Sequence, residues 1–415
     1  MQPRAITGLG IVSTIGVGRE AFMRALHAPA PAPPPDGGRA EAKVESFDAA
    51  AYPGARILEV RGFDASRYLG DKGLRTLDRL TKLLIVAARL AMHDAGFKKD
   101  GAYVVSSPEH VGLVCSNAYG SLEAITELDR VAVLEDARYI NPAKFPNTVS
   151  NSAAGYVSIW EDLRAMNVSV SDGNCGALDA VACADVFLET KRADALLVGG
   201  AEAMSEALYL AFHRLGALQE TRPAAEGSHS AGRLGAGAVI GEGAALLVTE
   251  AVELAKARGA SILAEVFGYG TAFVPPENEG LLIHPSAEAM ERAIVEALAD
   301  AGVRPGEIDI VASGVSGLAP FDQAELSAIT RTLGQDARIA APKELLGETL
   351  GAGGAMAMAA SLAWLEGAPP AALVRGYGGK TSSAAQGASG AINTVLVTSM
   401  GYYGNASAVV MRKSA

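Results

Sequence analysis

Short apolar runs alternate with longer segments of helical periodicity along most of the chain, a pattern typical of an α/β protein. The runs that predict buried strands are residues 5–12, 110–115, 195–199, 244–248, 308–312 and 392–398. The segments that predict helices are residues 77–95, 177–192, 286–301 and 351–366. Two further stretches, residues 28–38 and 216–235, are rich in proline or glycine and are predicted to be irregular.

The two halves of the chain carry similar features near their middles. In each half a glycine-rich turn precedes a helix of small residues: residues 173–177 read Gly-Asn-Cys-Gly-Ala, and residues 347–351 read Gly-Glu-Thr-Leu-Gly. This pattern predicts a duplicated α/β unit, with residues 1–250 as the N-terminal half and residues 251–415 as the C-terminal half. Two such halves packed face to face would bring both helix N-termini to one buried centre.

The composition indicates a globular protein and excludes several classes of function. The chain has 415 residues, of which 49% are hydrophobic and 20% charged, enough to build one large core or two. Its 35 basic and 46 acidic side chains give a formal net charge of −11, so a surface that repels phosphate backbones is expected and a nucleic-acid partner is not. Because no apolar run is long enough to span a membrane and no signal peptide opens the chain, a soluble, cytoplasmic protein is expected.

The three cysteines, Cys115, Cys175 and Cys183, are too few for a disulfide framework and lack the spacing of metal ligands. No metal site is expected, and no dinucleotide cofactor either, because the glycine-rich turns lack the required spacing. Cys175 is placed where a helix should begin, and a helix N-terminus would lower the thiol pKa and could bind a thioester oxygen. The alternative is that Cys175 is a small buried apolar residue, as Cys115 and Cys183 are expected to be.

Six segments carry recognisable motifs in a fixed order: residues 6–13, 141–148, 172–180, 241–244, 343–354 and 398–407. The third reads Asp-Gly-Asn-Cys-Gly-Ala-Leu-Asp-Ala, and the last reads Thr-Ser-Met-Gly-Tyr-Tyr-Gly-Asn-Ala-Ser. Together they resemble the nucleophile motif, the lysine segment and the C-terminal gatekeeper loop of the β-ketoacyl synthase family. The resemblance implies a thiolase-like, five-layer αβαβα fold of two duplicated halves, usually assembled as a two-fold dimer.

The resemblance also implies roles for individual residues. Cys175 is at the position of the nucleophile that takes an acyl chain from a carrier protein, and Lys343 is at the position of a lysine that supports a histidine. Tyr402 is at the gatekeeper position, where its backbone amide would pair with that of Cys175 as an oxyanion hole. The implied partner is an acyl carrier protein or an acyl-coenzyme A thioester, with no cofactor and no metal.

Both active-site histidines of that family are missing. Matching the glycines of the first motif places Ser313 at the histidine position, whereas counting back from an acidic pair that includes Asp322 places Gly314 there. Counting five residues on from Lys343 places Glu348 at the second histidine position. Because the loss of one preorganised donor typically costs about 10²–10³ in rate, we expect this chain alone to be a poor decarboxylating condenser.

Glu348 has several possible roles in the vacated site. If ionised, it could remove a proton from Cys175 or from a nucleophile that attacks an acyl thioester, and if protonated it could donate to a carbonyl. Alternatively, Glu348 forms an internal ion pair with Lys343. The simplest role for Asp322 is that of a helix cap or a loop anchor.

Two functions stay open at this point, and a degenerate structural paralogue is a third. In the first, the chain is a partner subunit that pairs with a complete ketosynthase, as chain-length factors do, through an apolar interface around residues 145–155 and 158–163. In the second, it is a stand-alone acyltransferase or hydrolase that uses Cys175 with Glu348 as base. Loss of both histidines favours the first function, and the intact nucleophile motif favours the second. A homodimer and a heterodimer fit equally well.

Overall fold

The computed structural model describes residues 1–28, 44–48, 51–52, 56–219, 237–278, 283–370, 373–374 and 390–414. The irregular segment predicted at residues 28–38, except for its first residue, and most of that at residues 216–235 lie outside these ranges. Across the described ranges, no helix is both long and apolar enough to cross a membrane.

Eleven strands of the described residues form one sheet. They are β1 (Arg4–Ser13), β2 (Gly16–Val17), β6 (Val111–Ser116), β7 (Asn167–Val170), β8 (Ala195–Glu202), β10 (Gly243–Ala251), β11 (Ala264–Phe273), β12 (Ile310–Ala312), β13 (Ile339–Ala340), β14 (Thr394–Met400) and β15 (Asn405–Arg412). Their order is β13-β12-β14-β15-β11-β1-β10-β8-β6-β7, with β2 paired to β1. Two short pairs lie apart from this sheet: β3 (Ile57–Leu58) with β9 (Ile240–Gly241), and β4 (Lys98–Lys99) with β5 (Ala102–Tyr103).

The strand pairing repeats in the two halves of the sheet. In the N-terminal half β6 lies parallel to β7 and β8, and β10 lies antiparallel to β8 and β1. In the C-terminal half β12 lies parallel to β13 and β14, and β15 lies antiparallel to β14 and β11. A short antiparallel pairing of β1 with β11 joins the halves. Such a repeat is what a duplicated α/β unit predicts, while the exact boundary after residue 250 stays a prediction.

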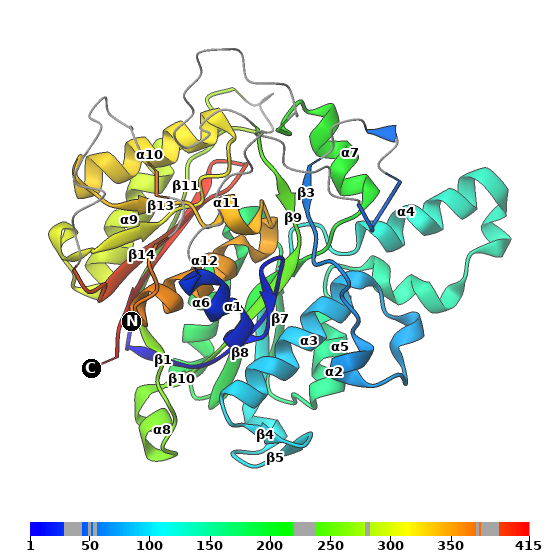
Figure 1. Ribbon diagram of the computed structural model, residues 1–415, viewed down its shortest axis with the longest axis horizontal. Helices are drawn as coiled ribbons and strands as arrows, with labels where there is room; N and C mark the ends of the chain where they lie inside the picture. Colours follow the sequence, from blue (N-terminus) through cyan, green and yellow to red (C-terminus); the bar gives the residue numbers. More distant parts are fainter. Residues whose placement is uncertain are drawn as a thin grey trace.

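Helices cover both halves of the sheet and fill the space between them (Figure 1). The helices are α1 (Arg19–His27), α2 (Ser66–Leu69), α3 (Arg79–Asp94), α4 (Leu122–Arg130), α5 (Ser152–Glu161), α6 (Gly176–Glu189), α7 (Glu206–Arg214), α8 (Val252–Ala257), α9 (Ala287–Ala301), α10 (Ala319–Leu333), α11 (Lys343–Leu346) and α12 (Gly353–Leu365). The pair α3 and α5 packs on the N-terminal half, α9 and α10 pack on the C-terminal half, and α6 and α12 touch both halves. This is the αβαβα layering that the sequence resemblance implied.

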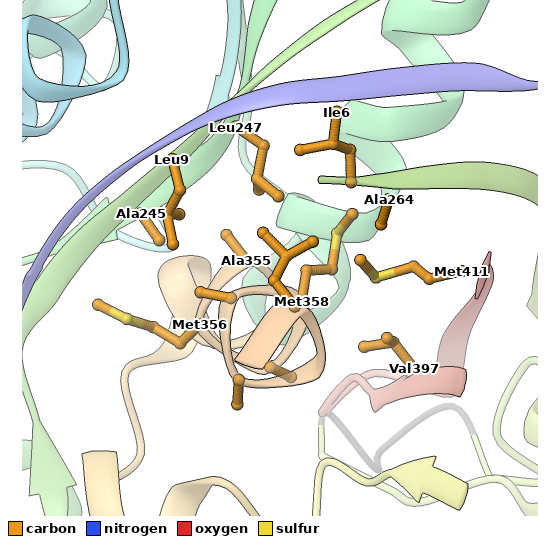
Figure 2. Close-up of a cluster of buried hydrophobic side chains, with 14 of the residues drawn as sticks. Ile6, Leu9, Ala245, Leu247, Ala264, Ala355, Met356, Met358, Val397 and Met411 are labelled. Atoms are coloured by element: carbon orange, nitrogen blue, oxygen red, sulfur yellow. The ribbon is translucent and has the colours of Figure 1, made fainter. Parts of the chain in front are cut away.

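The helix α12 forms the centre of the hydrophobic core. All of its residues are buried, and most of them are Ala, Gly or Met. Met356 and Met358 extend from α12 into a cluster that includes Met411 of β15 (Figure 2), where flexible thioethers fill the irregular space. Small residues let α6 approach closely, because a Cβ at Gly354 would lie 2.8 Å from Leu178. The turns η7 (Gly173–Cys175) and η9 (Leu350–Ala352), which precede α6 and α12, therefore meet at the centre, as predicted.

All six predicted strands and all four predicted helices are present, with ends that differ by up to three residues. Among the elements that the hydrophobic pattern missed are the long strands β11 and β15 and the helices α5, α7 and α10. In β11, Gly268 and Gly270 break the apolar run because α9 packs directly on the strand: a Cβ at Gly270 would lie 2.2 Å from Ala293 O. Because α9 packs so closely on β11, these two positions must be glycine. The strand therefore lacks apolar side chains that would have predicted it from the sequence.

Candidate active site

Four of the predicted site residues come from segments that meet around η7 and η9. Cys175 ends η7, Lys343 begins α11, Glu348 lies between α11 and η9, and Tyr402 follows β14. The positive charge of Lys343 lowers the pKa of the Cys175 thiol, and the negative charge of Glu348 raises the pKa of the Tyr402 hydroxyl. These four residues therefore lie in one region of the protein. Ser313 and Asp322 lie after β12 and in the first turn of α10.

Lys343 and Glu348 form a buried ion pair, with Lys343 Nζ 2.8 Å from Glu348 Oε2. The other carboxylate oxygen, Oε1, accepts the Leu350 N–H at 2.9 Å. The backbone of Glu348 is also fixed, because its N–H donates to Val239 O and its carbonyl accepts the Gly241 N–H. The internal ion pair weighed from the sequence is therefore present, and both oxygens of Glu348 have partners.

Cys175 is completely buried, and its Sγ donates to Ser399 O at 3.3 Å. Burial raises the pKa of the Cys175 thiol well above its usual range, and the carboxyls of Asp179 and Asp172 raise it further. The lowered pKa expected from the helix N-terminus is thus wrong, because the loss of water around the sulfur outweighs that effect. The Cys175 N–H donates to Asp172 O at 3.1 Å, so an oxyanion hole built on this amide requires that bond to open or be shared.

The other two cysteines do not contribute to this region. Cys115 is buried in β6, where desolvation raises its pKa to about 12. Cys183 is half-buried on α6, and burial raises its pKa as well. Both therefore act as packing residues, as expected.

Neither candidate for the first histidine position offers a free side-chain donor. Ser313 Oγ donates to Ala340 O at 2.8 Å, and Gly314 has no side chain. Asp322 accepts the N–H groups of Ser316 (3.0 Å) and Gly317 (2.9 Å), and burial raises its pKa to about 6. Asp322 is therefore placed as an anchor for the loop after β12.

A second carboxyl, Glu325, holds the same loop from inside the protein. Its Oε1 accepts Thr398 Oγ1 at 2.6 Å and the Gly314 N–H at 2.8 Å. Burial raises the pKa of Glu325, although these two hydrogen bonds and the charge of Lys343 oppose the shift. The loop is thus fixed by two acidic side chains of α10 instead of presenting a donor to a ligand.

Asn174, which sequence reasoning did not single out, lies beside Tyr402. Burial and the charge of Glu348 raise the pKa of the Tyr402 hydroxyl well above its usual range, while the Asn174 side chain opposes the shift. Asn174 Oδ1 and Tyr402 Oη are both buried without a partner in good hydrogen-bond geometry, although the Tyr402 hydroxyl lies close enough to the side chains of Asn174 and Glu348 for both to affect its pKa. In the sequence, Asn174 has no signal of its own beyond its place next to Cys175.

Glu202, which the sequence analysis also did not identify, is the last residue of β8 and contacts η9 in the same region. Its Oε2 accepts the N–H groups of Ala118 (2.8 Å) and Gly351 (3.2 Å), and burial raises its pKa to about 8. Towards the surface, the partly exposed Tyr119 and Tyr403 lie close enough for their hydroxyls to interact. A charged residue at the end of an apolar, glycine-rich run was the available signal for Glu202.

His284 supports the Tyr402 loop from the C-terminal half. Its backbone N–H donates to Tyr402 O at 2.9 Å, and its ring Nε2 is 3.1 Å from Val274 O. The Val274 N–H in turn donates to Gly404 O at 2.9 Å. His284 is thus a structural brace and does not replace either missing histidine. In the described part of the chain, no group of three or more His, Cys, Asp or Glu side chains is arranged to hold a metal ion.

Two family models match most of the chain. Residues 1–255 match the N-terminal domain of β-ketoacyl synthases, and residues 263–371 match the C-terminal domain. A 3-oxoacyl-[acyl-carrier-protein] synthase 2 of Rhizobium meliloti is 31% identical over 379 residues, which cover 86% of this chain and 84% of that protein. The enzyme of the same name from Coxiella burnetii is 30% identical over 364 residues, covering 85% and 83%.

Solved structures show the same fold over the whole chain. The ishigamide ketosynthase/chain length factor is similar with a TM-score of 0.83 and 23% identity, and both chains are covered completely. A β-ketoacyl synthase from Burkholderia phymatum is similar with a TM-score of 0.81 and 25% identity, again with complete coverage of both chains. From the matched domains, the relatives and the layered fold around η7 and η9, we conclude that the chain belongs to the β-ketoacyl synthase family.

Proposed function

We propose that this chain is a non-condensing partner subunit of the chain-length-factor type. In this role it pairs in the cytoplasm with a complete ketosynthase that extends acyl thioesters on an acyl carrier protein. The observation that carries the proposal is the buried Lys343–Glu348 ion pair at the position where the family has its second histidine.

The chemistry of decarboxylative condensation supports this reading. Loss of CO₂ from a malonyl thioester leaves an enolate, which needs neutral hydrogen-bond donors around its oxygen. At the second histidine position this chain has a carboxylate that already binds Lys343. At the first it has either Gly314, which has no side chain, or Ser313, whose hydroxyl already donates to Ala340 O. Two missing donors cost about 10⁴ or more in rate, and a carboxylate adds repulsion of the malonyl group.

A projecting arm supports an interface with a second subunit. It comprises α4, η4 (Val131–Asp136), η5 (Ala137–Tyr139) and η6 (Pro142–Thr148), and it extends away from the layered core at the right of Figure 1. Several of its large apolar side chains are exposed, notably Val133, Leu134, Tyr139 and Phe145. Apolar side chains gathered on one projecting element are typical of a protein–protein contact. The interface predicted around residues 145–155 and 158–163 adjoins this arm, and Ile159 of α5 is exposed there.

The second candidate is a stand-alone acyltransferase that loads an acyl group on Cys175 and uses Glu348 as base. It is favoured by one observation, the placement of Cys175 directly before the first turn of α6. If Glu348 is a base, Glu348→Gln should abolish turnover and leave acyl loading largely intact. If loading also collapses, Glu348 activates the thiol itself.

Intact-protein mass spectrometry after incubation with acyl carrier proteins and acyl-coenzyme A thioesters tests the proposal. We expect no adduct on Cys175 with any donor, and no carbon–carbon bond formation from malonyl carrier protein by this chain alone. We also expect a complete ketosynthase to co-purify with the chain. An acyl adduct that maps to Cys175 and disappears in Cys175→Ala would overturn the partner-subunit role in favour of the acyltransferase.

A further inference from the structure

The strand β14 holds the turn η7 through its residue Ser399. Ser399 Oγ donates to Asn174 O at 2.7 Å, and Cys175 Sγ donates to Ser399 O at 3.3 Å. Because η7 belongs to the N-terminal half of the chain and β14 to the C-terminal half, these bonds fasten one half to the other. Neither bond involves a group that titrates near neutral pH, since burial holds the pKa of the Cys175 thiol well above its usual range.

The strand β15 holds the same turn and the helix that follows it through two carboxyl groups. Asn405 Nδ2 donates to Asp172 Oδ2 at 2.9 Å, directly before η7. Ser407 Oγ donates to Asp179 Oδ1 at 2.6 Å, in the first turn of α6. Asn405 and Ser407 are buried, whereas Asp172 and Asp179 are half-buried. Unlike the bonds to β14, these two bonds end on groups that can gain or lose a proton.

The carboxyls of Asp172 and Asp179 also lie within hydrogen-bonding reach of each other. Two carboxylates cannot form that bond, because both only accept hydrogen bonds, so it exists only while one of the two carries a proton. Burial, the hydrogen bond with Asp172 and its charge raise the pKa of Asp179 to about 7, although the hydroxyls of Ser407 and Thr271 oppose the shift. The pair therefore changes from one negative charge to two near neutral pH.

The other groups that face the pair do not neutralise its second charge. Thr271 of β11 is uncharged, and the Cys175 thiol of η7 stays protonated. The ring of Tyr403, from the loop after β14, lies beside the first residue of η7. Lys343 of α11, whose charge reaches Cys175, is paired with Glu348 at 2.8 Å. Once both carboxyls are ionised, they therefore repel each other without a cation between them.

The remaining charged groups on the elements around α6 act elsewhere. Asp185, further along α6, pairs with Arg4 of β1 at 2.6 Å. Glu202 of β8 accepts the N–H of Gly351 in η9. The helix α12, which packs on α6, has no titratable side chain. The charge of the Asp172–Asp179 pair is thus set mainly by its own protonation.

We propose that Asp172 and Asp179 form a proton-controlled clamp on the turn that carries Cys175. While they share one proton, the bond between them ties the start of η7 to the first turn of α6, in addition to the bonds from β14 and β15. When that proton is lost, the two carboxylates repel each other and η7 is held by β14 and β15 alone. The Cys175 thiol is then exposed to solvent more often, because its burial depends on the position of η7. The clamp goes beyond the proposed function and does not depend on it.

Amide hydrogen exchange of the full chain gives the first test. Protection factors of peptides that cover residues 172–180, corrected for the intrinsic pH dependence of exchange, are measured by mass spectrometry from about pH 5.5 to pH 8.5. The clamp is closed below about pH 7 and is lost as the pH rises through that value, so we expect the wild-type protection factor to fall at least about fivefold. In Asp179→Asn, which keeps a donor for Asp172 but has no proton to lose, it should stay constant. Identical pH courses for the two proteins would overturn the proposal.

Two comparisons separate the clamp from other titrating groups. Glu202, with a pKa of about 8, is present in both proteins, so its own effect on η9 cancels. Asp129→Asn is the matched control, because it removes an exposed carboxyl of α4. Residues 172–180 should keep the wild-type pH course in that variant. If Asp129→Asn removed the pH dependence as Asp179→Asn does, the net charge of the chain would be its cause, and the clamp would be wrong.

Infrared difference spectra observe the shared proton directly and give the second test. A protonated carboxyl has a C=O stretching band that a carboxylate lacks, and we expect one such band to be present in the wild type at about pH 6, lost by about pH 8, and missing from Asp179→Asn. In Asp172→Asn the midpoint of this loss should move at least about one pH unit lower, because an amide donor favours the ionised form of Asp179. Equal spectra of the wild type and Asp179→Asn at pH 6 would overturn the proposal. If Asp179→Asn does not fold, an unshifted midpoint in Asp172→Asn would overturn it as well.

Discussion

At the scale of single residues, the site is shaped by which charges have partners. Lys343 and Glu348 are both buried, and each is the other's counter-ion. Removing one member of a buried ion pair leaves an uncompensated charge away from water, which is more costly than the pair is stabilising. The pair therefore explains how the two charged side chains persist at the centre of the fold.

The first prediction concerns this pair. Glu348→Gln should lower the free energy of unfolding by about 3–5 kcal/mol, because the Lys343 ammonium stays buried without its carboxylate. The double variant Lys343→Met with Glu348→Gln should recover most of that loss, since no charge is then buried. Urea denaturation of the three proteins at neutral pH measures both effects.

An exposed pair supplies the control for this measurement. Glu288 and Arg292 form an ion pair 2.8 Å apart on the surface of α9. Glu288→Gln should change the free energy of unfolding by less than about 1 kcal/mol, as exposed pairs do. If Glu288→Gln and Glu348→Gln lowered the free energy of unfolding equally, the buried pair would contribute no more to stability than an exposed one.

At the scale of elements, Glu202 joins three segments that are far apart in the sequence. It ends β8, and its carboxyl holds the N–H groups of Ala118, after β6, and of Gly351, in η9. Gly351 itself leaves no room for a side chain, because a Cβ there would lie 2.5 Å from Asn117 Cα. One buried carboxyl thus fixes the turn before α12 against the edge of the N-terminal half.

The second prediction is a pH dependence of stability that Glu202 causes. Burial raises its pKa to about 8 from the usual 4.5, so between these values the folded chain keeps a proton that the unfolded chain releases. The wild-type protein therefore loses stability from this group as the pH rises through that window, and the loss levels off above about pH 8. Glu202→Gln has no proton to keep, so its thermal midpoint should rise relative to the wild type from pH 5 to pH 8, then stay constant.

The same comparison with Glu253→Gln serves as a control. Glu253 is exposed in the first turn of α8, so its replacement should give a midpoint difference that does not change across this range. A flat difference for Glu202→Gln would mean that Glu202 ionises normally in the folded protein. Because each comparison uses the wild type at the same pH, the titration of all other groups cancels.

The sequence predicted elements well wherever a local pattern identifies them. The small-residue run of α12 and the spacing of Lys343 to Glu348 are local, and both appear as expected. The thiol pKa of Cys175 was predicted in the wrong direction, because a helix N-terminus is visible in the sequence and tertiary burial is not. Asn174 and Glu202 acquire their surroundings only when β8, η7 and η9 meet, so their local signals, a place next to Cys175 and a charge at the end of an apolar strand, do not reveal what they contact.

At the scale of the whole molecule, the layered core and the projecting arm have opposite character. The core encloses α12 so completely that even its polar Ser361 is buried. On the arm, Val133 is 72% exposed and Leu134 is 75% exposed. Exposing both to water costs hydrophobic free energy that a second subunit could recover, at roughly 25 cal/mol for each Å² of apolar surface covered. This contrast is why we place the proposed subunit interface on the arm.

The third prediction follows from that placement. The double variant Val133→Asp with Leu134→Asp should weaken binding to the co-purifying ketosynthase at least about tenfold, because two carboxylates would have to be desolvated in the contact. Size-exclusion chromatography with light scattering of the co-expressed proteins should then show the wild-type chain in a complex heavier than its own 42.5 kDa and the variant chain near that mass. Val104→Asp is the matched control, since Val104 is 59% exposed beside β5, away from the arm. Its association should be unchanged, and so should the thermal midpoint of both variants. If the arm variant associates as strongly as the wild type, the interface lies on another face, and the arm's exposed side chains need a different explanation.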